Sequence, residues 1–549
     1  MKKWKAWTVI PLVAGIILIF MFFSLTGCGK GGLETVVLPI ILSVFPQDGI
    51  TGVSTRPAVS ATFSREMNGS TLNSSTFLLA SAEGRVTGNV SYDAPSKTAV
   101  FSPQIDLYSN TTYVATVTAG AKDNAGSGME RDYAWSFSTV PMPAPTFYPT
   151  AGTYESAQTI AISSTIGADI YYTLDGSTPT IASTKYVNPF ALTSSETVKA
   201  IAVKDGVLFS SVATAKYDIY SWQALGSGMD NVVSALAMDT AGNLYAGGSF
   251  VTAGGVAANH VARWNGINWE AIGAGLDGVV SAIVVDPSGN IYAGGNFLTA
   301  EGVTVNYIAK WNGIVWKGVG GGFNNSVSAL ALDPSGTLYA AGGFTSAEGN
   351  PAKYIAKWNG SNWSPLGSGM NYFVTSMAID SSGNLYAGGA FTNAGGITAN
   401  RIARWDGSSW SPLGLGLNGD VDVLAIDDSG NLYAGGQFSQ AGGSSANRVA
   451  KWNGSNWSAL GSGANNRVYA LAADSVGNLF VGGEFSIADE IAVNYCAKWN
   501  GSSWSALRVG TNASIYEMKV DHQDNLYAGG PFIMAGGTVA ANRIAKWGK

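Results

Sequence analysis

The sequence predicts an all-β protein in which two β-sandwich domains precede a seven-bladed β-propeller with velcro closure. Two series of residues predict the propeller, because tryptophan and aspartate each return with a step of 47 residues. A regular repeat of this length is typical of propellers and solenoids. The tryptophans are Trp222, Trp269, Trp316, Trp363, Trp410, Trp457 and Trp504, and the aspartates are Asp239, Asp286, Asp333, Asp380, Asp427, Asp474 and Asp521.

Residues 1–28 have the pattern of a targeting segment. Three lysines near the N-terminus precede an apolar run from about Val9 to Leu25, which ends in Thr26-Gly27-Cys28. A basic start, an apolar stretch and small residues before a cleavage point are typical of secretory signals. The alternative is an uncleaved transmembrane anchor, because the apolar run approaches spanning length. In both cases the bulk of the chain is exported, and residues 29–40 form a short tether.

The segment from Leu25 to Cys28 resembles the lipobox of bacterial lipoproteins. The resemblance implies that Cys28 is lipidated and anchors the chain to a membrane of the bacterial cell envelope. Gly29 follows where an Asp often marks inner-membrane retention, so we expect the outer membrane or the cell surface. With Cys28 acylated, Cys496 has no cysteine to pair with, and we expect it to be a small core residue.

Residues 41–140 predict a β-sandwich of about 100 residues, because short alternating runs are separated by Gly, Asn, Ser and Pro. The expected strands cover residues 58–63, 76–79, 99–102, 113–118 and 134–138. The strings FPQDGITGVSTRPAVSATFSREM, NTTYVATV, KDNAGS and YAWSFST resemble the bacterial Ig-like domain of surface-layer proteins. This resemblance implies a spacer, with Trp135 and Phe137 on the core face of one strand.

Residues 141–218 predict a second sandwich. ADIYYTLDGSTPT and TVKAIAVKDG resemble the C-terminal sandwich domain of chitobiases and hexosaminidases. The resemblance implies no catalysis, since in those enzymes another domain performs the chemistry. Tyr171 and Tyr172 fall on opposite faces of one strand, so at most one is an exposed sugar-stacking ring. Packing in the sandwich interior is the favoured role for both.

Residues 219–549 predict the propeller blades. One unit reads as strands at 280–285, 291–295 and 307–311 and a fourth beginning at Trp316, and four strands per repeat make one blade. Hairpin loops at 286–290 and 312–313 share one face of the disc. The long connection at 296–306 and the loop entering each blade share the other. The lone Trp222 strand completes the last blade, and DSSGNLYAGG resembles bacterial propeller repeats.

The recurring residues are expected to be structural. Each Asp is interpreted as an Asx turn, because the alternating ligands and closing Glu of a calcium loop are missing. The two Trp series raise a lectin hypothesis, but paired aromatics also stabilise hairpins, and packing is favoured. A cation precedes the second Trp of every blade and is expected to pair locally, since a ring of unpaired cations would repel itself. These cations are Arg263, Lys310, Lys357, Arg404, Lys451, Lys498 and Lys546.

Residues that vary between blades are the candidate ligand-binding residues, because packing does not explain them. They lie in the loops that enter the blades. Tyr372 and Phe373 stand out as consecutive aromatics where other blades carry mostly polar or small residues. The full set is Asp230, Asn231, Asn324, Asn325, Asn371, Tyr372, Phe373, Asn418, Asp420, Asn465, Asn466 and Arg467.

Composition argues against several function classes. Charged residues make up 12% of the chain and the net charge is −6. The sequence has no cluster of basic residues of the kind that binds nucleic acids. The only histidines are His260 and His522, so the sequence has no cluster of His and Cys residues that could bind a transition metal. We expect no cofactor. No catalytic residues are assigned, although carboxylate chemistry of the glycosidase kind needs only two acids.

The sequence thus predicts an exported, lipid-anchored surface protein, held to the membrane by its N-terminus, that presents a propeller to a protein or surface-polymer ligand. The alternative is a propeller lectin or a carbohydrate-processing enzyme.

Overall fold

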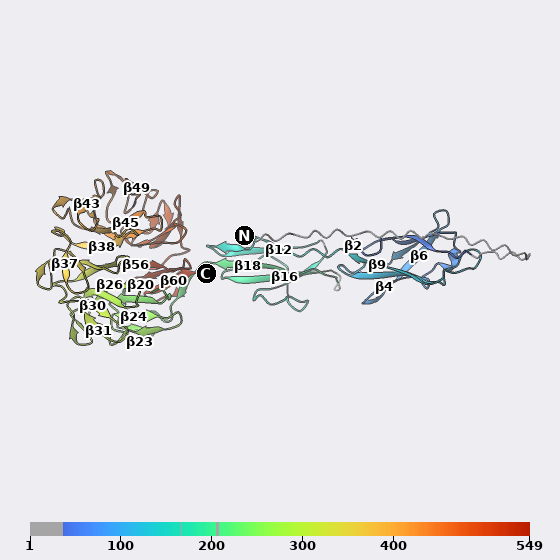
Figure 1. Ribbon diagram of the computed structural model, residues 1–549, viewed down its shortest axis with the longest axis horizontal. Coiled ribbons are helices and arrows are strands. Elements are labelled where there is room, and N and C mark those ends of the chain that lie inside the picture. The colour runs from blue at the N-terminus through green and yellow to red at the C-terminus, as the bar shows by residue number, and fades with distance from the viewer. Residues whose placement is uncertain (1–36, 166, 205–207) are drawn as a thin grey trace, which may run out of the picture. The chain divides into compact units, whose positions relative to one another are not determined.

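The computed structural model describes residues 37–165, 167–204 and 208–549. The expected signal segment, Cys28 and most of the tether lie outside the described residues. The described residues form strands, turns and a short 3-10 turn at Gly69–Thr71 (Figure 1), which confirms the all-β prediction. Within these ranges, no helix has the length and apolar character needed to span a bilayer. The chain divides into two compact units between Met142 and Pro143.

The first unit is a sandwich of two sheets. Its strands are β1 (Ile41–Phe45), β2 (Ile50–Val53), β3 (Val59–Phe63), β4 (Phe77–Ser81), β5 (Gly84–Arg85), β6 (Gly88–Asp93), β7 (Thr98–Pro103), β8 (Thr112–Val117) and β9 (Tyr133–Thr139). They pair in the orders β1-β3-β7-β6 and β2-β9-β8-β4-β5. Alternation along β3 and β9 turns every second side chain inward, and Trp135 and Phe137 are buried together as predicted.

The second unit begins with another sandwich. Its strands are β10 (Thr146–Tyr148), β11 (Gly152–Tyr154), β12 (Gln158–Ser163), β13 (Asp169–Thr173), β14 (Thr184–Lys185), β15 (Phe190–Leu192), β16 (Glu196–Lys204), β17 (Leu208–Phe209) and β18 (Ala213–Ile219). One sheet runs β10-β12-β15, and the other runs β11-β18-β16-β13-β14 with β17 on β16. Tyr172 stacks on Phe190 with ring centres 4.6 Å apart and packs against the core, so packing is confirmed for this tyrosine.

The remaining part of the second unit is propeller-like. Among the described residues it forms seven four-stranded sheets, and the second of them runs in the order β26 (Val279–Val285), β27 (Ile291–Asn296), β30 (Ile308–Trp311) and β31 (Trp316–Gly318). The innermost strands are β20 (Val233–Met238), β26, β32 (Val327–Leu332), β38 (Val374–Ile379), β44 (Val421–Ile426), β50 (Val468–Ala473) and β56 (Glu517–Val520). Each inner strand contacts the next, and β56 contacts β20, so they form a closed ring.

The last sheet combines both ends of this region. Its order is β19 (Ser221–Ala224), β60 (Ile544–Gly548), β57 (Leu526–Gly529) and β56. In the register of β19 on β60, Trp222 lies opposite Trp547. The first strand of the region is therefore the outer strand of its last sheet.

The first tryptophan series joins neighbouring blades. All seven side chains are buried, and six of the indole N–H groups each donate to a backbone carbonyl 44 residues earlier, as Trp316 does to Ile272 at 2.9 Å. Trp222 donates instead to Leu507 at 3.0 Å and so joins the first strand to the last blades. Because an indole buried in this way satisfies its donor and fills the space between sheets, packing is confirmed as its role.

The recurring aspartates close the hairpins between the first two strands of each blade. Oδ1 of Asp286 accepts the N–H groups of Ser288 and Asn290, and Oδ2 accepts from the Asn290 amide. Burial opposes the charged form of Asp239, but its hydrogen bonds from Asn243 and from Tyr245 prevail and lower its pKa. The Asx-turn prediction is confirmed.

The second hairpin of each blade differs from the tight Asn-Gly turn predicted. Four residues, Asn312 to Val315, separate β30 from β31. The Asn312 side chain accepts the N–H groups of Ile314 and Val315, which stabilises this longer loop.

Most of the basic residues beside the second tryptophans interact locally. Arg263 pairs with Glu270 of its own blade at 2.6 Å, Arg404 donates to Asn384, and Lys310 lies over the Tyr292 ring. The local interpretation is confirmed for these positions. Cys496 is buried, which confirms the prediction of a core side chain. Burial raises the pKa of its thiol to about 12.

The long connections and the blade-entry loops lie on one face, as predicted. A bridge joins Leu276 of an entry loop to Ala300 of a long connection, and the same bridge recurs in the other blades. The long connections also contain a hairpin that the sequence analysis missed, such as β28 (Thr299–Ala300) with β29 (Val303–Thr304).

Candidate functional site

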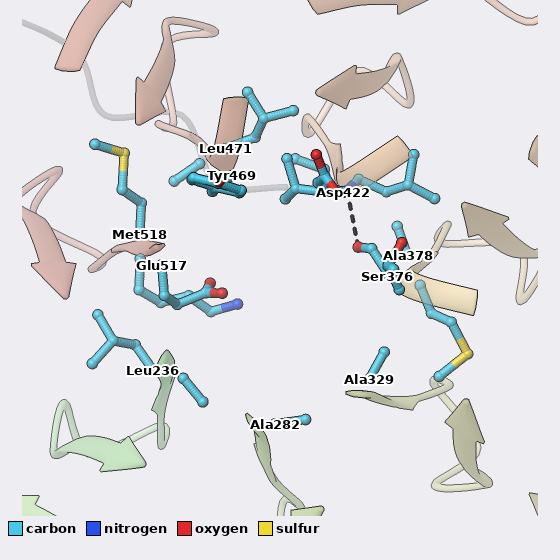
Figure 2. A pocket seen from close by; sticks show the side chains of 18 of the residues that line it. Leu236, Ala282, Ala329, Ser376, Ala378, Asp422, Tyr469, Leu471, Glu517 and Met518 are labelled. Atoms are coloured by element: carbon cyan, nitrogen blue, oxygen red, sulfur yellow. Dashed lines mark hydrogen bonds between the residues drawn. The ribbon is translucent and has the colours of Figure 1, made fainter. Parts of the chain in front are cut away.

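A cavity of about 800 Å³ lies where the seven inner strands meet, and we call it the channel. Every inner strand contributes to its wall, and Figure 2 shows side chains from several blades around it. The strands converge here, so the repeat places small side chains on them. One position of each inner strand places Leu, Ile or Met at the channel in all seven blades, and three other positions differ between the blades.

The first channel position is held by Ser234, Ser281, Ser328, Thr375, Asp422, Tyr469 and Tyr516. The second is held by Ala235, Ala282, Ala329, Ser376, Val423, Ala470 and Glu517, and the third by Ala237, Val284, Ala331, Ala378, Ala425, Ala472 and Lys519. Blades one to three therefore present only small or uncharged side chains. Large and charged ones gather on the last three blades, and with the adjacent Arg467 they form what we call the polar wall: Asp422, Arg467, Tyr469, Tyr516, Glu517 and Lys519.

Two residues of the polar wall, Asp422 and Arg467, form a bidentate ion pair. The Arg467 guanidinium donates to both carboxylate oxygens of Asp422 at 2.7 Å. The Asp422 side chain is 9% exposed and that of Arg467 is 33% exposed. Burial raises the pKa of Asp422 although Arg467 opposes the shift, so the channel environment outweighs the partner.

Two tyrosines continue the wall beside this pair. Arg467 lies over the Tyr469 ring at 4.9 Å, and the Tyr469 and Tyr516 rings meet edge to face at 5.3 Å. Burial, and next the Glu484 carboxylate, raise the pKa of Tyr469 to about 12. The Tyr469 hydroxyl therefore stays protonated near neutral pH and can donate a hydrogen bond.

Glu517 carries a carboxyl group into the channel, where Figure 2 shows it pointing. Burial raises its pKa to about 7, against the opposing effects of Lys519 and the Met518 N–H. Of the described residues, none forms an ion pair with it within 4.0 Å. A carboxylate whose charged form is destabilised by burial, and that has no such ion-pair partner, is poised to bind a ligand that enters the channel.

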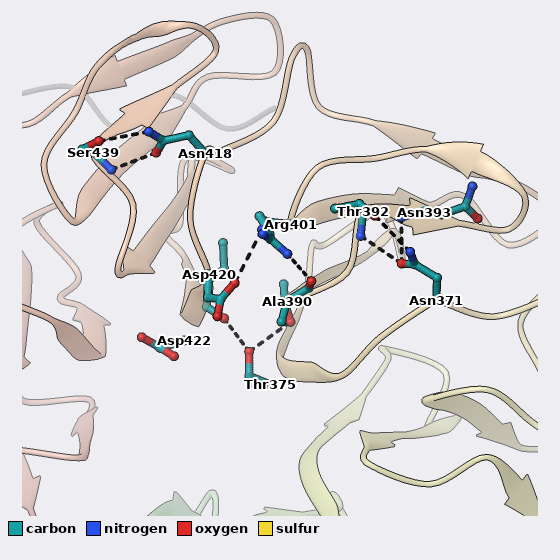
Figure 3. A network of polar contacts seen from close by, with 12 residues as sticks. Asn371, Thr375, Ala390, Thr392, Asn393, Arg401, Asn418, Asp420, Asp422 and Ser439 are labelled. Atoms are coloured by element: carbon teal, nitrogen blue, oxygen red, sulfur yellow. Dashed lines mark hydrogen bonds and ion pairs between the residues drawn. The ribbon is translucent and has the colours of Figure 1, made fainter.

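A second polar network borders the channel at blades four and five (Figure 3). Arg401 approaches Asp420 at 3.5 Å and donates to the Ala390 carbonyl. The Thr375 hydroxyl donates to the carbonyls of Gly388, in its own blade, and Val421, in the next. These contacts fix the positions of the two blades relative to each other at the channel edge.

Five predicted ligand residues have structural roles instead. The Asn371 side chain accepts the N–H groups of Thr392 and Asn393 at 2.9 Å, and so holds the long connection (Figure 3). The premise that these positions vary between blades is wrong, because Asp or Asn recurs at each of them with the 47-residue step. The series is Asp230, Asp277, Asn324, Asn371, Asn418, Asn465 and Asn512.

Three further predicted residues form local turns. The side chains of Asn231, Asn325 and Asn466 each accept the N–H of the residue that follows. We therefore leave these residues, and the series above, out of the candidate site.

The other four predicted residues stay candidates, and one of them, Arg467, lines the channel. Phe373, Asp420 and Arg467 each stand directly before an inner strand, which places them at equivalent points of neighbouring blades. Tyr372 and Phe373 are 49% and 43% exposed, with ring centres 4.4 Å apart. Five residues of the polar wall were missed, namely Asp422, Tyr469, Tyr516, Glu517 and Lys519. The signal was a small residue replaced by a large or charged one at a fixed repeat position.

Three parts of the chain match known domain families. Residues 36–139 match the bacterial Ig-like domain, and residues 149–215 match the chitobiase/beta-hexosaminidase C-terminal domain. Residues 364–525 match the Rax2 C-terminal beta propeller domain. The predicted resemblances of both sandwiches and the propeller assignment are thereby confirmed. Among curated proteins, no sequence matches the chain.

Solved structures also resemble the chain at low identity. The WD40 beta propeller domain of Doa1 is 12% identical, with a TM-score of 0.39, over 60% of this chain and 97% of that one. U3-55K is 12% identical, with a TM-score of 0.42, over 60% and 98%. The extracellular domain of BT4673 from B. thetaiotaomicron is 12% identical, with a TM-score of 0.36, over 92% and 69%.

Proposed function

We propose that the protein is an exported, lipid-anchored surface protein that binds a protein or surface polymer at the channel. The polar wall is the observation that carries this proposal. The repeat supplies small residues at the channel positions of the first three blades, so packing does not require Asp422, Tyr469 or Glu517 there. A cavity with aromatic rings and a few converging polar groups is what ligand sites usually contain.

The exposed aromatic pair Tyr372 and Phe373 extends the proposed surface beyond the channel. Aromatic side chains contribute much of the binding energy of protein interfaces, since they bury large areas at low entropic cost. The match of residues 36–139 to a bacterial Ig-like domain supports a place at the cell surface. In this proposal the two sandwiches are spacers, and the propeller is the recognition domain.

A carbohydrate-processing enzyme is the second candidate function, and one observation favours it. Asp422 and Glu517 line the same channel, and Glu517 with a pKa of about 7 can hold or release a proton near neutral pH. Glycoside hydrolysis needs two such carboxyl groups in different roles. Arg467 already occupies both oxygens of Asp422, which favours binding over catalysis.

A panel of glycans and of cell-surface proteins, titrated with the full chain, tests the proposed function. We expect saturable binding of at least one surface protein or polymer, and at least tenfold weaker binding by a chain carrying Tyr372→Ala and Phe373→Ala. The matched control is Ile314→Ala, at an exposed apolar residue of a hairpin on the other face. Hydrolysis of any panel glycan would replace the binding proposal with the enzymatic one.

Metabolic labelling with palmitate tests the lipid anchor. We expect the chain to incorporate the label and the Cys28→Ser variant to lose it completely, because Cys28 is the proposed acylation site. Cys496→Ser is the matched control and should label fully, since its thiol is buried. Label that persists in Cys28→Ser would contradict the lipoprotein assignment.

A further inference from the structure

We propose that the channel binds a cationic group on an aliphatic chain, a primary ammonium or a guanidinium, with Glu517 as its counter-ion. The inference rests on the proposed function and narrows its ligand chemistry. A lysine or arginine side chain of a partner protein carries such a group, and so does a free aliphatic amine. The argument depends on the charges in the channel, on their burial and on the other side chains of its wall.

The charges of the channel are not equivalent. Asp422 and Arg467 compensate each other through two hydrogen bonds, so neither needs a ligand. Glu517 and Lys519 have no ion-pair partner within 4.0 Å among the described residues. Lys519 is exposed and solvated, whereas Glu517 is half-buried and its charged form is destabilised by burial. A half-buried charge gains more from a partner than an exposed one, because water compensates it less.

A ligand that enters from the side of the blade-entry loops reaches Glu517 before it reaches Lys519. Tyr516 stands directly before β56, on the side of the blade-entry loops, and Glu517 and Lys519 follow within the strand. A group entering from that side passes two tyrosine rings, whose faces attract cations. It then reaches the carboxyl group of Glu517, with Lys519 further along the channel.

The rest of the wall fits a cation with an apolar stem. Ser234, Ser281 and Ser328 offer hydroxyl oxygens that accept hydrogen bonds, as an ammonium group requires. Alanine and leucine side chains such as Ala282, Ala329 and Leu236 provide apolar surface for methylene groups (Figure 2). An anionic ligand would instead meet Glu517 at close range in a partly desolvated channel, which costs free energy.

Isothermal titration of the full chain with cadaverine, Nα-acetyl-lysine amide and the neutral analogue 1,5-pentanediol tests the proposal at a pH above the Glu517 pKa. We expect at least one of the two cations to bind, and the diol to bind at least tenfold more weakly. Tighter binding of the acetyl-lysine amide identifies a protein side chain as the source, and tighter binding of cadaverine identifies a free amine. Equal binding of diol and cations, or no binding of either cation, would overturn the inference.

The repeat itself supplies matched variants that we expect to retain the fold. Glu517→Ala and Lys519→Ala each install a residue that other blades carry at the same position. We expect Glu517→Ala to weaken cation binding at least tenfold, and Lys519→Ala to leave it unchanged or to strengthen it. Loss of cation binding in Lys519→Ala alone would overturn the assignment of Glu517. If a panel ligand binds while these cations do not, the inference fails and the proposed function stands.

Discussion

Replacing Trp316 with alanine is expected to lower the free energy of unfolding by about 3–5 kcal/mol, the usual cost of removing a large buried aromatic side chain. Trp316 is 1% exposed and packs between neighbouring sheets. Its indole N–H donates to the Ile272 carbonyl at 2.9 Å, so the substitution also leaves that acceptor without its partner. Urea denaturation followed by circular dichroism measures the loss.

Two variants separate packing from hydrogen bonding at this site. Trp316→Phe keeps most of the ring but removes the donor, and we expect it to cost about 1–3 kcal/mol. Ile314→Ala, two residues away, removes a side chain that is 82% exposed and should change stability by less than about 0.5 kcal/mol. A Trp316→Ala variant as stable as Ile314→Ala would contradict the role assigned to the tryptophan series.

Replacing Glu517 with glutamine is expected to stabilise the protein at about pH 8 by roughly 1–3 kcal/mol and to have little effect at about pH 4. The pKa of this carboxyl is raised from its ordinary value of 4.5 to about 7 in the folded state, chiefly by burial. The folded state therefore favours the protonated form. Its cost is absent below pH 4.5, grows between pH 4.5 and 7, and is complete above pH 7.

Thermal unfolding of both chains across this pH range measures the effect. The difference between Glu517→Gln and the wild type should open between the two pKa values and then stay constant. Other titratable groups in the channel wall, Asp422, Tyr469, Tyr516 and Lys519, are present in both chains, so their contributions cancel to first order. A difference that is the same at both ends of the range would show that Glu517 is not desolvated in the channel.

The regular part of the fold was predictable because its causes are local. Alternation gave β27 as residues 291–295 where the strand covers Ile291–Asn296, and the Asp286 turn followed from side-chain chemistry. The hairpins within the long connections were missed, because strands of two residues show no alternation. The loop that begins at Asn312 is longer than predicted. An Asn-Gly pair indicates a turn but does not fix its length, because the Asn side chain can accept two N–H groups and stabilise a longer loop.

The candidate site was only partly predictable. Tyr372 and Phe373 were found as departures from the repeat in an entry loop. The structural role of Asn371, one residue earlier, was not predicted, because its bonds to Thr392 and Asn393 join segments that the sequence does not show to be close. Asp422 and Glu517 lie in strands that are far apart in the sequence, and only the closed ring of inner strands brings them into one channel.

One measurement tests most directly whether the irregular channel residues are the binding site and the repeat is its support. A variant with a regularised channel takes, at each position of the polar wall, a residue that another blade carries there: Asp422→Ser, Arg467→Ser, Tyr469→Ser, Tyr516→Ser, Glu517→Ala and Lys519→Ala. We predict that this variant keeps the circular dichroism spectrum of the wild type and loses binding of the panel ligand at least a hundredfold. A folded variant that binds the ligand with wild-type affinity would contradict the account.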